Sequence, residues 1–274
     1  MIRPLAVLAA AIALCACTPG LEKKDGYVVD TRHAAYGARP RIKTLVIHYT
    51  AEDFPRSLAT LTDREVSAHY LIPAKPLQQA SQPIVLRLVP ESQLAWHAGI
   101  SFWRGATRLN DTSIGIELEN PGYRRTAGGL SWYPFPAGQM AALTPLMRDI
   151  IIRYNIQPQD VVGHSDIAPQ RKQDPGPLFP WRWLSQQGIG AWPEAARVRY
   201  YLAGRAPEQL TDGAYLLKLL ARYGYEVTPG PSAKQQQRVI AAFQMHFRPA
   251  NYSGIADAES EAIAAALLEK YGDD

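Results

Sequence analysis

Runs of apolar and β-branched residues, each short enough to be a single strand, mark the first two thirds of the chain. Their length of about four to eight residues and their β-branched content are typical of strands buried in a sheet. These runs cover residues 44–50, 66–72, 84–89, 113–119 and 161–164.

One helix is predicted between the last two of these runs, over residues 138–154. Apolar residues recur there at the spacing of a helix face, and Pro145 is expected to bend the helix. Strands that interleave with helices predict an α/β fold, in which a mixed central β-sheet is flanked by helices. We expect this domain over residues 41–193, a length that can bury one substantial core.

The pattern changes in the last third of the chain, where no strand-like run occurs and three amphipathic helices are predicted. Thr211 is expected to cap the first helix and Asp257 the third. Ser232 and Gln235 are expected to form a capping box on the second. We therefore expect a small all-α three-helix domain over residues 194–274, large enough to fold alone.

The first residues have the pattern of a secretory signal. Arg3 supplies a positive charge, and the apolar run over residues 5–14 is too short for a transmembrane helix. Residues 14–17, Leu-Cys-Ala-Cys, resemble a bacterial lipobox, in which the peptidase cuts before a cysteine that then carries acyl chains. This predicts a lipoprotein signal peptide over residues 1–16 and lipidation of Cys17. An ordinary signal peptide with incidental cysteines is the alternative.

A polar segment with several prolines and glycines follows, and residues 17–40 are expected to form a lipidated tether. Several acyl chains anchor a protein stably to a membrane without a transmembrane helix. Thr18 stands where Asp is the usual inner-membrane retention residue. We therefore expect an outer-membrane protein that faces the periplasm and contacts the membrane through Cys17.

The charge balance excludes one class of partner. The formal net charge is +4, and no run of Lys or Arg builds a stripe for nucleic acid. Cys15 is predicted to leave with the signal and Cys17 to be acylated, so the mature chain has no free thiol. A metal site must therefore be built from His, Asp or Glu. The tether and two compact domains need no partner chain, so we expect a monomer.

Two of the six histidines end apolar runs. His48 and His164 lie near the carboxyl ends of strands, where open α/β sheets tend to place their sites, and the stiff loop that follows can return Asp174 toward them. Two imidazoles and one carboxylate are the protein ligands of one kind of catalytic zinc site. Spacing alone does not pair the two histidines, and a satisfied, partly buried histidine is the alternative for each. We interpret His33 and His246 as surface residues.

Two further groups are candidates for chemistry. The alternation of side chains along the fourth strand puts Glu117 and Glu119 on one face. The two carboxylates either serve acid–base chemistry or form the solvated side of an edge strand. The residues alone favour the solvated side. Trp96 and His97 are flanked by small residues, which lets an aromatic ring and an imidazole line a cleft.

Several of these residues fall in motifs that closely resemble the type-2 N-acetylmuramoyl-L-alanine amidases, the family of phage amidases and peptidoglycan recognition proteins. Within that family the motifs are most similar to the AmpD-like branch. The resemblance is strong over residues 41–185. The motifs occur in this order: VIHYT at 46–50, SAHYLI at 67–72, AWHAG at 95–99, SIGIEL at 113–118, GHSDIAP at 163–169 and RKQDPGP at 171–177.

The resemblance implies a role for each matching residue. His48, His164 and Asp174 correspond to zinc ligands, so Zn²⁺ is the expected cofactor. Glu117 corresponds to the catalytic carboxylate, and Lys172 resembles the cation that steadies the developing oxyanion.

Other positions are implied less directly by the resemblance. Ala68 stands where other branches have a catalytic Tyr, and the AmpD-like branch uses the carboxylate of Glu117 instead. His69 is expected to be structural. Three residues are expected to bind substrate: Trp96, His97 and Asn120.

The function implied is hydrolysis of the amide bond between N-acetylmuramic acid, or its anhydro form, and L-Ala of the peptidoglycan stem peptide. Peptidoglycan and muropeptides are the expected partners. The C-terminal segment resembles three-helix peptidoglycan-binding domains, and a packing extension without a ligand is the alternative. A non-catalytic peptidoglycan receptor or anchor lipoprotein and a zinc peptidase acting within the stem peptide are the competing functions.

Overall fold

The computed structural model describes residues 20–272 and divides the chain into two units, which meet between Arg39 and Pro40. In the first unit, β1 (Leu21–Lys23) and β2 (Val28–Asp30) form a small antiparallel hairpin within the predicted tether. The predicted signal peptide and Cys17 lie outside the described residues. Over residues 20–272, the helices are too short or too polar to cross a membrane.

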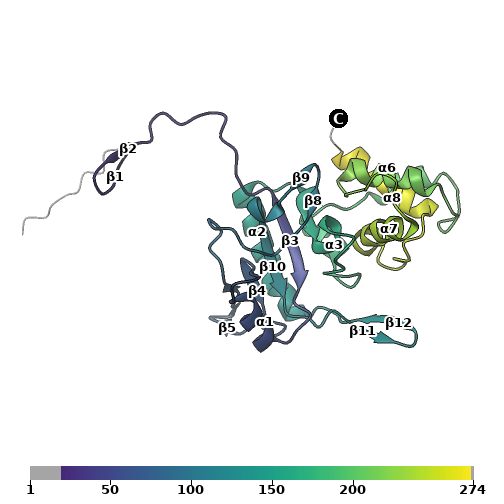
Figure 1. Cartoon of the computed structure of the whole chain (residues 1–274), viewed down its shortest axis with the longest axis horizontal. Coiled ribbons are helices and arrows are strands. Elements are labelled where there is room, and N and C mark those ends of the chain that lie inside the picture. The colour runs from purple at the N-terminus through teal and green to yellow at the C-terminus, as the bar shows by residue number, and fades with distance from the viewer. Residues whose placement is uncertain (1–19, 273–274) are drawn as a thin grey trace, which may run out of the picture. The chain divides into compact units, whose positions relative to one another are not determined.

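The second unit contains a five-stranded sheet in the order β13-β3-β10-β4-β7. Figure 1 labels its three central strands, β3, β10 and β4. The strands β13, β3, β10 and β4 are parallel to one another, and β7 is antiparallel to β4. The sheet is therefore mixed, as predicted. Its strands are β3 (Thr44–Tyr49), β4 (Tyr70–Ile72), β7 (Leu86–Arg87), β10 (Ser113–Leu118) and β13 (Val161–Gly163).

β10, which carries Glu117, is a central strand of the sheet. The residues alone favoured an edge strand, with its glutamates facing solvent. β10 lies between β3 and β4, and in its register Glu117 is beside His48 of β3. Because side chains alternate along a strand, Ser113, Gly115 and Glu117 share one face, and the intervening isoleucines share the other. Glu119, just beyond the strand, accepts hydrogen bonds from the main-chain nitrogens of Phe54 and Ala74 instead of facing solvent alone.

The two faces of the sheet are covered by different helices (Figure 1). On one face, Leu45, Ile47, Ile114 and Ile116 join a buried cluster with α2 (Ala137–Tyr154), the predicted helix, which contains Pro145. On the other face, the short helix α3 (His164–Ile167) follows β13 directly.

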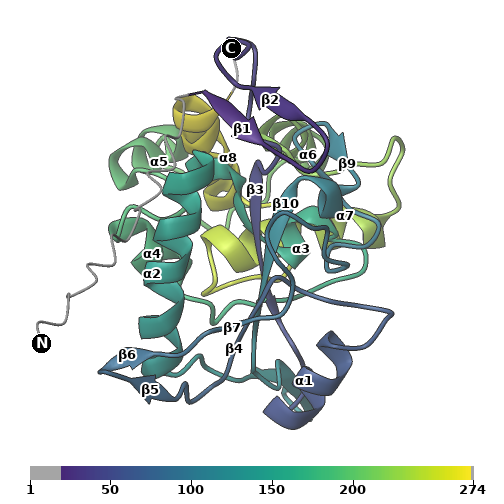
Figure 2. The same cartoon turned by 90° about the vertical axis from the view of Figure 1, so that its left-hand side faces the viewer.

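The remaining elements are short, and the sequence patterns did not predict them. Figure 2 shows α1 and the β5–β6 hairpin at the same end of the sheet. These elements are α1 (Phe54–Leu61), β5 (Gln78–Gln79), β6 (Gln82–Pro83), β8 (Phe102–Trp103), β9 (Ala106–Thr107), β11 (Tyr123–Thr126), β12 (Gly129–Trp132), the 3-10 turns Leu109–Asp111 and Pro158–Asp160, and α4 (Trp181–Gln186).

The C-terminal segment is helical, as predicted, with one helix more than the three expected. The capping box of Ser232 and Gln235 and the cap at Asp257 are confirmed, whereas the cap predicted at Thr211 falls on Asp212. The helices are α5 (Ala195–Leu202), α6 (Gly213–Tyr223), α7 (Ala233–Phe247) and α8 (Ala258–Tyr271).

One hydrophobic cluster runs from the sheet into these helices. Val46 of β3, Val162 of β13 and Ile167 of α3 belong to the same buried cluster as Phe243 of α7 and Leu220 of α6. Residues 40–274 accordingly form one compact unit. Independent folding of residues 194–274 stays a prediction, and in this structure their core is continuous with that of the sheet domain.

Candidate metal centre and active site

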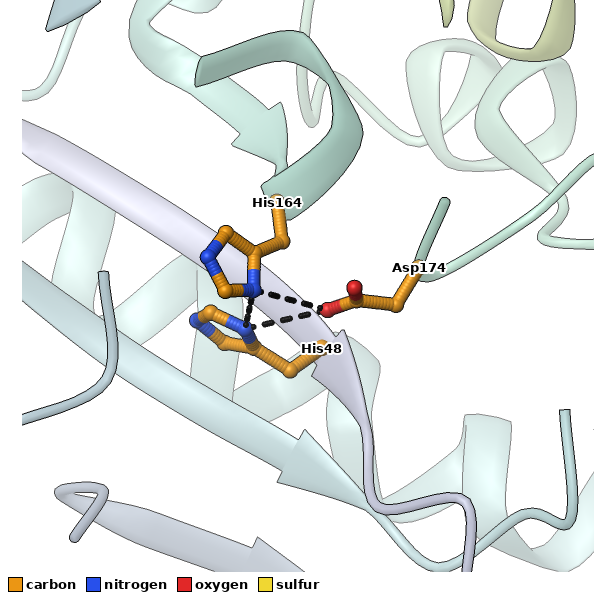
Figure 3. A group of neighbouring side chains, drawn as sticks. All are labelled: His48, His164 and Asp174. Carbon is orange, nitrogen blue, oxygen red and sulfur yellow. Dashed lines mark hydrogen bonds and ion pairs between the residues drawn. The ribbon is translucent and has the colours of Figure 1, made fainter. Parts of the chain in front are cut away.

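Three side chains from two distant parts of the sequence meet at the carboxyl edge of the sheet. His48 lies near the end of β3, His164 opens α3 directly after β13, and Asp174 lies in the loop beyond α3. Since β3 and β13 are parallel neighbours, both histidines emerge at one edge. Nδ1 of His48 lies 2.9 Å from Nδ1 of His164, and each nitrogen is 3.1 Å from Oδ2 of Asp174 (Figure 3). All three side chains are buried.

A hydrogen-bond chain behind His48 decides which of its ring nitrogens carries the proton. The hydroxyl of Ser113 donates to the carbonyl oxygen of Leu109 at 2.6 Å, so its oxygen accepts from Nε2 of His97 at 3.1 Å. Nδ1 of His97 is then an acceptor, and Nε2 of His48 donates to it at 3.0 Å. Burial and the neighbouring His164 lower the pKa of His48 to about 4, so its ring is neutral at pH 7. Its Nδ1 therefore presents a lone pair.

His164 is oriented in the same way by the main chain. Its Nε2 donates to the carbonyl oxygen of Ala98 at 3.1 Å, which leaves Nδ1 with a lone pair. Such a hydrogen bond behind a ligating histidine fixes both the tautomer and the ring orientation. Two lone pairs and a carboxylate thus face one another inside the protein.

This arrangement fits a metal ion. Lone pairs held 2.9 Å apart repel each other, and a cation between them removes the repulsion. The ligand atoms of His48, His164 and Asp174 all lie within 4.8 Å of one another, and over residues 20–272 no other His, Cys, Asp or Glu group meets this criterion. Two imidazoles and a carboxylate are donors that suit Zn²⁺, and three protein ligands leave a fourth position for water or substrate.

Glu117 lies beside the cluster because it is the register partner of His48. Its Oε2 is buried and has no hydrogen-bond partner among the residues that the structure describes. Burial and the negative charge of Asp174 raise the pKa of Glu117 to about 8, and the charge of Lys172 acts against them. A group whose pKa lies this close to neutrality changes its protonation state when the charge beside it changes, as a group that accepts and returns a proton must. A cation held by His48, His164 and Asp174 would add to the effect of Lys172 and favour the carboxylate form.

These residues line an open cleft of about 520 Å³. Lys172 lies in its wall, and so does Trp96, whose side chain is 58% exposed. The C-terminal segment also reaches this cleft, since Arg238 of α7 lies in the wall and donates to the carbonyl oxygen of Gln170 at 2.9 Å. The cleft has the size of a small-molecule or peptide site, and charged groups of both signs line it.

The other residues predicted to bind substrate lie in different settings. His97 borders the cleft, but its ring is buried and both of its nitrogens are occupied by Ser113 and His48. The side-chain amide of Asn120 is also occupied: it donates to the carbonyl oxygens of Tyr133 and Pro134 and accepts from the main chain. These contacts favour a supporting role for both residues.

The expectation that His69 is structural agrees with its contacts. His69 is fully buried, accepts from the main-chain nitrogen of Gly115 through Nδ1, and faces the carbonyl oxygen of Gln93 through Nε2.

The sequence patterns missed several residues that support the site. A side chain at Gly115 would place its Cβ 2.4 Å from the ring of His97, so only glycine leaves room for that ring. Ser113 shares the face of Gly115 and Glu117, and period-two alternation on that strand was the signal that would have grouped them. The interpretation of His246 as a surface residue is wrong, because the ring is buried against the segment that carries His164.

An α/β sheet with a buried His–His–Asp cluster at its carboxyl edge, beside a carboxylate in an open cleft, has the features of a metal-dependent hydrolase. Comparison with known proteins identifies the family within that class. The family model for N-acetylmuramoyl-L-alanine amidases matches residues 38–177, and the chain belongs to this family.

Full-length relatives are found as well. The chain is 63% identical over 270 residues to the N-acetylmuramoyl-L-alanine amidase AmiD of Escherichia coli, with 98% of each protein covered. It resembles a solved complex of E. coli AmiD with the substrate anhydro-N-acetylmuramic acid-L-Ala-D-γ-Glu-L-Lys, at a TM-score of 0.91 and 64% identity over 93% of this chain and 99% of that chain. The chain also resembles a structure of AmpDh3 from Pseudomonas aeruginosa in complex with an anhydromuramic pentapeptide. The TM-score is 0.81 and the sequence identity 41%, over 89% of this chain and 98% of that chain. The resemblance and the fold predicted from the sequence are thereby confirmed.

Proposed function

We propose that this protein is a zinc-dependent N-acetylmuramoyl-L-alanine amidase. It hydrolyses the amide bond between N-acetylmuramic acid, or its anhydro form, and the L-Ala of a peptidoglycan stem peptide. The observation that carries the proposal is the convergence of His48, His164 and Asp174, with lone pairs facing inward, in a chain of the amidase family. The substrate follows from relatives that cover nearly the whole chain.

His48, His164 and Asp174 would hold the ion through Nδ1, Nδ1 and Oδ2. Bound zinc supplies a Lewis acid and lowers the pKa of a coordinated water to about 7. The ligands stay in place because the hydrogen bonds to His97 and Ala98 fix the two rings.

Two residues of the cleft carry the proton and charge changes of hydrolysis. Glu117 accepts the proton of the attacking water at its unpartnered Oε2 and later passes it to the leaving amine. Lys172 places a positive charge where the carbonyl oxygen becomes negative. Trp96 offers an exposed aromatic face on which the sugar or peptide can lie.

The experiment that tests this function combines metal removal with product analysis. The chain is stripped with chelator and incubated with defined muropeptides, with and without added zinc, and mass spectrometry identifies the products. We expect zinc-dependent release of the free sugar and of an intact peptide that begins at L-Ala. Cleavage within the peptide would instead support a zinc peptidase, and binding without cleavage would support a receptor.

We also propose that Cys17 is acylated and anchors the protein to the outer membrane, on its periplasmic side. The lipobox-like residues 14–17 and Thr18 support this proposal. Labelling with a radioactive fatty acid, followed by membrane fractionation, tests it against a Cys17→Ser variant. Label in the parent chain alone is the expected result, and equal membrane association of both chains contradicts the proposal.

A wall-binding role for residues 194–274 is part of the proposed function. It would raise the local concentration of substrate at the cleft. The test is co-sedimentation of a Glu117→Gln chain with intact sacculi, with a small muropeptide in excess to fill the cleft. Retained binding supports a second site, and complete competition contradicts it.

A further inference from the structure

The helix that begins with His164 is too short to hold its own position. α3 spans only His164–Ile167, and its side chains are all buried. A single helical turn fixes several dihedral angles for very few hydrogen bonds, so it is unstable without neighbours. The position of His164 therefore depends on what packs against and bonds to this turn.

Asp166 makes the side-chain bonds that secure this turn. Its Oδ2 accepts from the main-chain nitrogen of Gly163 at 2.7 Å and from Nδ1 of His246 at 2.7 Å. Its Oδ1 accepts from the hydroxyl of Tyr225 at 2.5 Å. His246 lies on α7, and Tyr225 follows α6. Two of these three donors therefore come from the C-terminal helices.

The carboxylate cannot keep its position without these donors. Asp166 is only 1% exposed, and a buried carboxylate without donors is strongly unfavourable. If the donors from His246 and Tyr225 are removed, only the Gly163 nitrogen, of the partners that the structure describes, still bonds the carboxylate, and rearrangement of the turn toward water is favoured. The same carboxylate oxygen holds Gly163, directly before His164, so the ligand moves with the turn.

His246 is itself held firmly. Its ring stacks on Trp181 of α4 at 4.0 Å between centroids and 15° between planes, and on Phe247 at 4.0 Å and 9°. This packing fixes the direction in which its Nδ1 points. The turn also reaches the third ligand, because the main-chain nitrogen of Ser165 donates to the carbonyl oxygen of Asp174 at 2.8 Å.

We propose that Asp166, His246 and Tyr225 form a positioning link, through which the C-terminal helices hold His164 in the geometry that binds the metal ion. The link rests on the metal site of the proposed function. It makes the C-terminal segment part of the metal centre, whether or not that segment binds the cell wall. His246 and Tyr225 act through Asp166 and are positioning residues.

The test measures zinc affinity of the full chain by competition with a chromophoric chelator. Tyr225→Phe removes one hydroxyl and keeps the ring, and His246→Leu removes the other donor. Tyr252→Phe is the matched control, because its hydroxyl accepts from Nε1 of Trp132 at 2.9 Å and so joins the same two parts of the chain through a bond that does not involve Asp166. We expect zinc affinity to fall about tenfold in Tyr225→Phe, further in His246→Leu, and less than about twofold in the control.

A second readout does not need the metal. Hydrogen exchange of the metal-free chains reports the opening of residues 163–168, and we expect faster exchange there in Tyr225→Phe but not in Tyr252→Phe. His246→Gln retains a side-chain donor and should recover part of the lost affinity.

The outcomes separate this link from the proposed function. If the parent chain binds no zinc, the metal site itself is wrong. If the parent binds zinc and Tyr225→Phe binds it equally well, or if the control loses as much affinity as Tyr225→Phe, the positioning link is wrong and the metal site stands.

Discussion

Two imidazole nitrogens, 2.9 Å apart and each oriented as an acceptor, define the centre of this protein. The orientation of His48 follows from one hydroxyl: because Ser113 gives its only proton to Leu109, His97 must donate to Ser113 and His48 must donate to His97. The position of the hydroxyl proton of Ser113 thus determines, through these hydrogen bonds, that Nδ1 of His48 carries a lone pair. His164 is oriented separately, by the carbonyl oxygen of Ala98.

Replacing Ser113 by Ala tests this series of hydrogen bonds. His97 loses the acceptor for its Nε2 proton, so the tautomers can reverse and place a proton on Nδ1 of His48, the atom assigned to the proposed metal site. We expect about a 10- to 100-fold loss of zinc affinity, measured by chelator competition. Ser57→Ala is the control, since Ser57 is also a buried serine, but its hydroxyl donates to the carbonyl oxygen of Asp53. Equal affinity in Ser113→Ala and the parent chain would show that the proton chain does not matter.

Glu117→Gln separates metal binding from catalysis. The amide keeps the shape of the side chain but cannot accept the proton of water, so we expect zinc to stay bound while kcat falls about 10²- to 10⁴-fold. The measurement is the zinc content of the purified chain together with muropeptide turnover. Glu52→Gln, at another carboxylate of the same cleft, should change turnover by less than about threefold. Parental turnover in the Glu117→Gln chain would show that Glu117 does not carry the proton in hydrolysis.

At the scale of elements, one carboxylate joins β4 to α2. Glu91 accepts hydrogen bonds from Tyr70 at 2.7 Å, from Arg153 at 2.8 Å and from Tyr154 at 2.8 Å. Burial acts to raise the pKa of Glu91, but these three partners outweigh it and lower the pKa to about 2.

The pH dependence of stability follows from this lowered pKa. A carboxyl group whose pKa is lower in the folded than in the unfolded chain stabilises the fold above its unfolded pKa of about 4.5, and this contribution is lost as the pH falls toward 2. We expect Glu91→Gln to lower the free energy of unfolding by about 1–2 kcal/mol at pH 7, discounted for solvent screening. Urea unfolding of both metal-free chains at pH 7, 5 and 3 measures the difference. It should shrink as the pH falls, and a constant difference would contradict this account.

The elements also show what periodicity can and cannot predict. The five strands and α2 were predicted because each has its own apolar pattern, although β4 and β7 are shorter than their runs. The order of the strands was not predicted, since pairing depends on contacts between distant segments. For this reason the residues alone favour the solvated side of an edge strand for Glu117 and Glu119, with acid–base chemistry as the alternative, whereas β10 is central. The ligand set came from family motifs, and Asp166 and His246 carried no local signal that would pair them.

At the scale of the whole molecule, the shared core makes the C-terminal helices structural partners of the sheet. Deleting residues 194–274 exposes apolar side chains on β3, β13 and α3, each of which contributes about 1.5–3 kcal/mol when buried. We therefore expect the shortened chain to be insoluble, or to melt more than about 10 °C below the parent. Deleting residues 1–39, a separate unit, is the control and should leave the melting temperature unchanged. A shortened chain with parental stability would show two independent domains.

The separation of the ligands along the chain has a consequence for the order of folding. His48 and His164 are 116 positions apart, and they meet only when β13 pairs with β3. Because no early segment of the chain contains the complete ligand set, the ion can be captured with full affinity only after this long-range closure, which is a slow kind of step in folding. If the proposed metal site is right, full metal occupancy would therefore indicate that β13 has paired with β3.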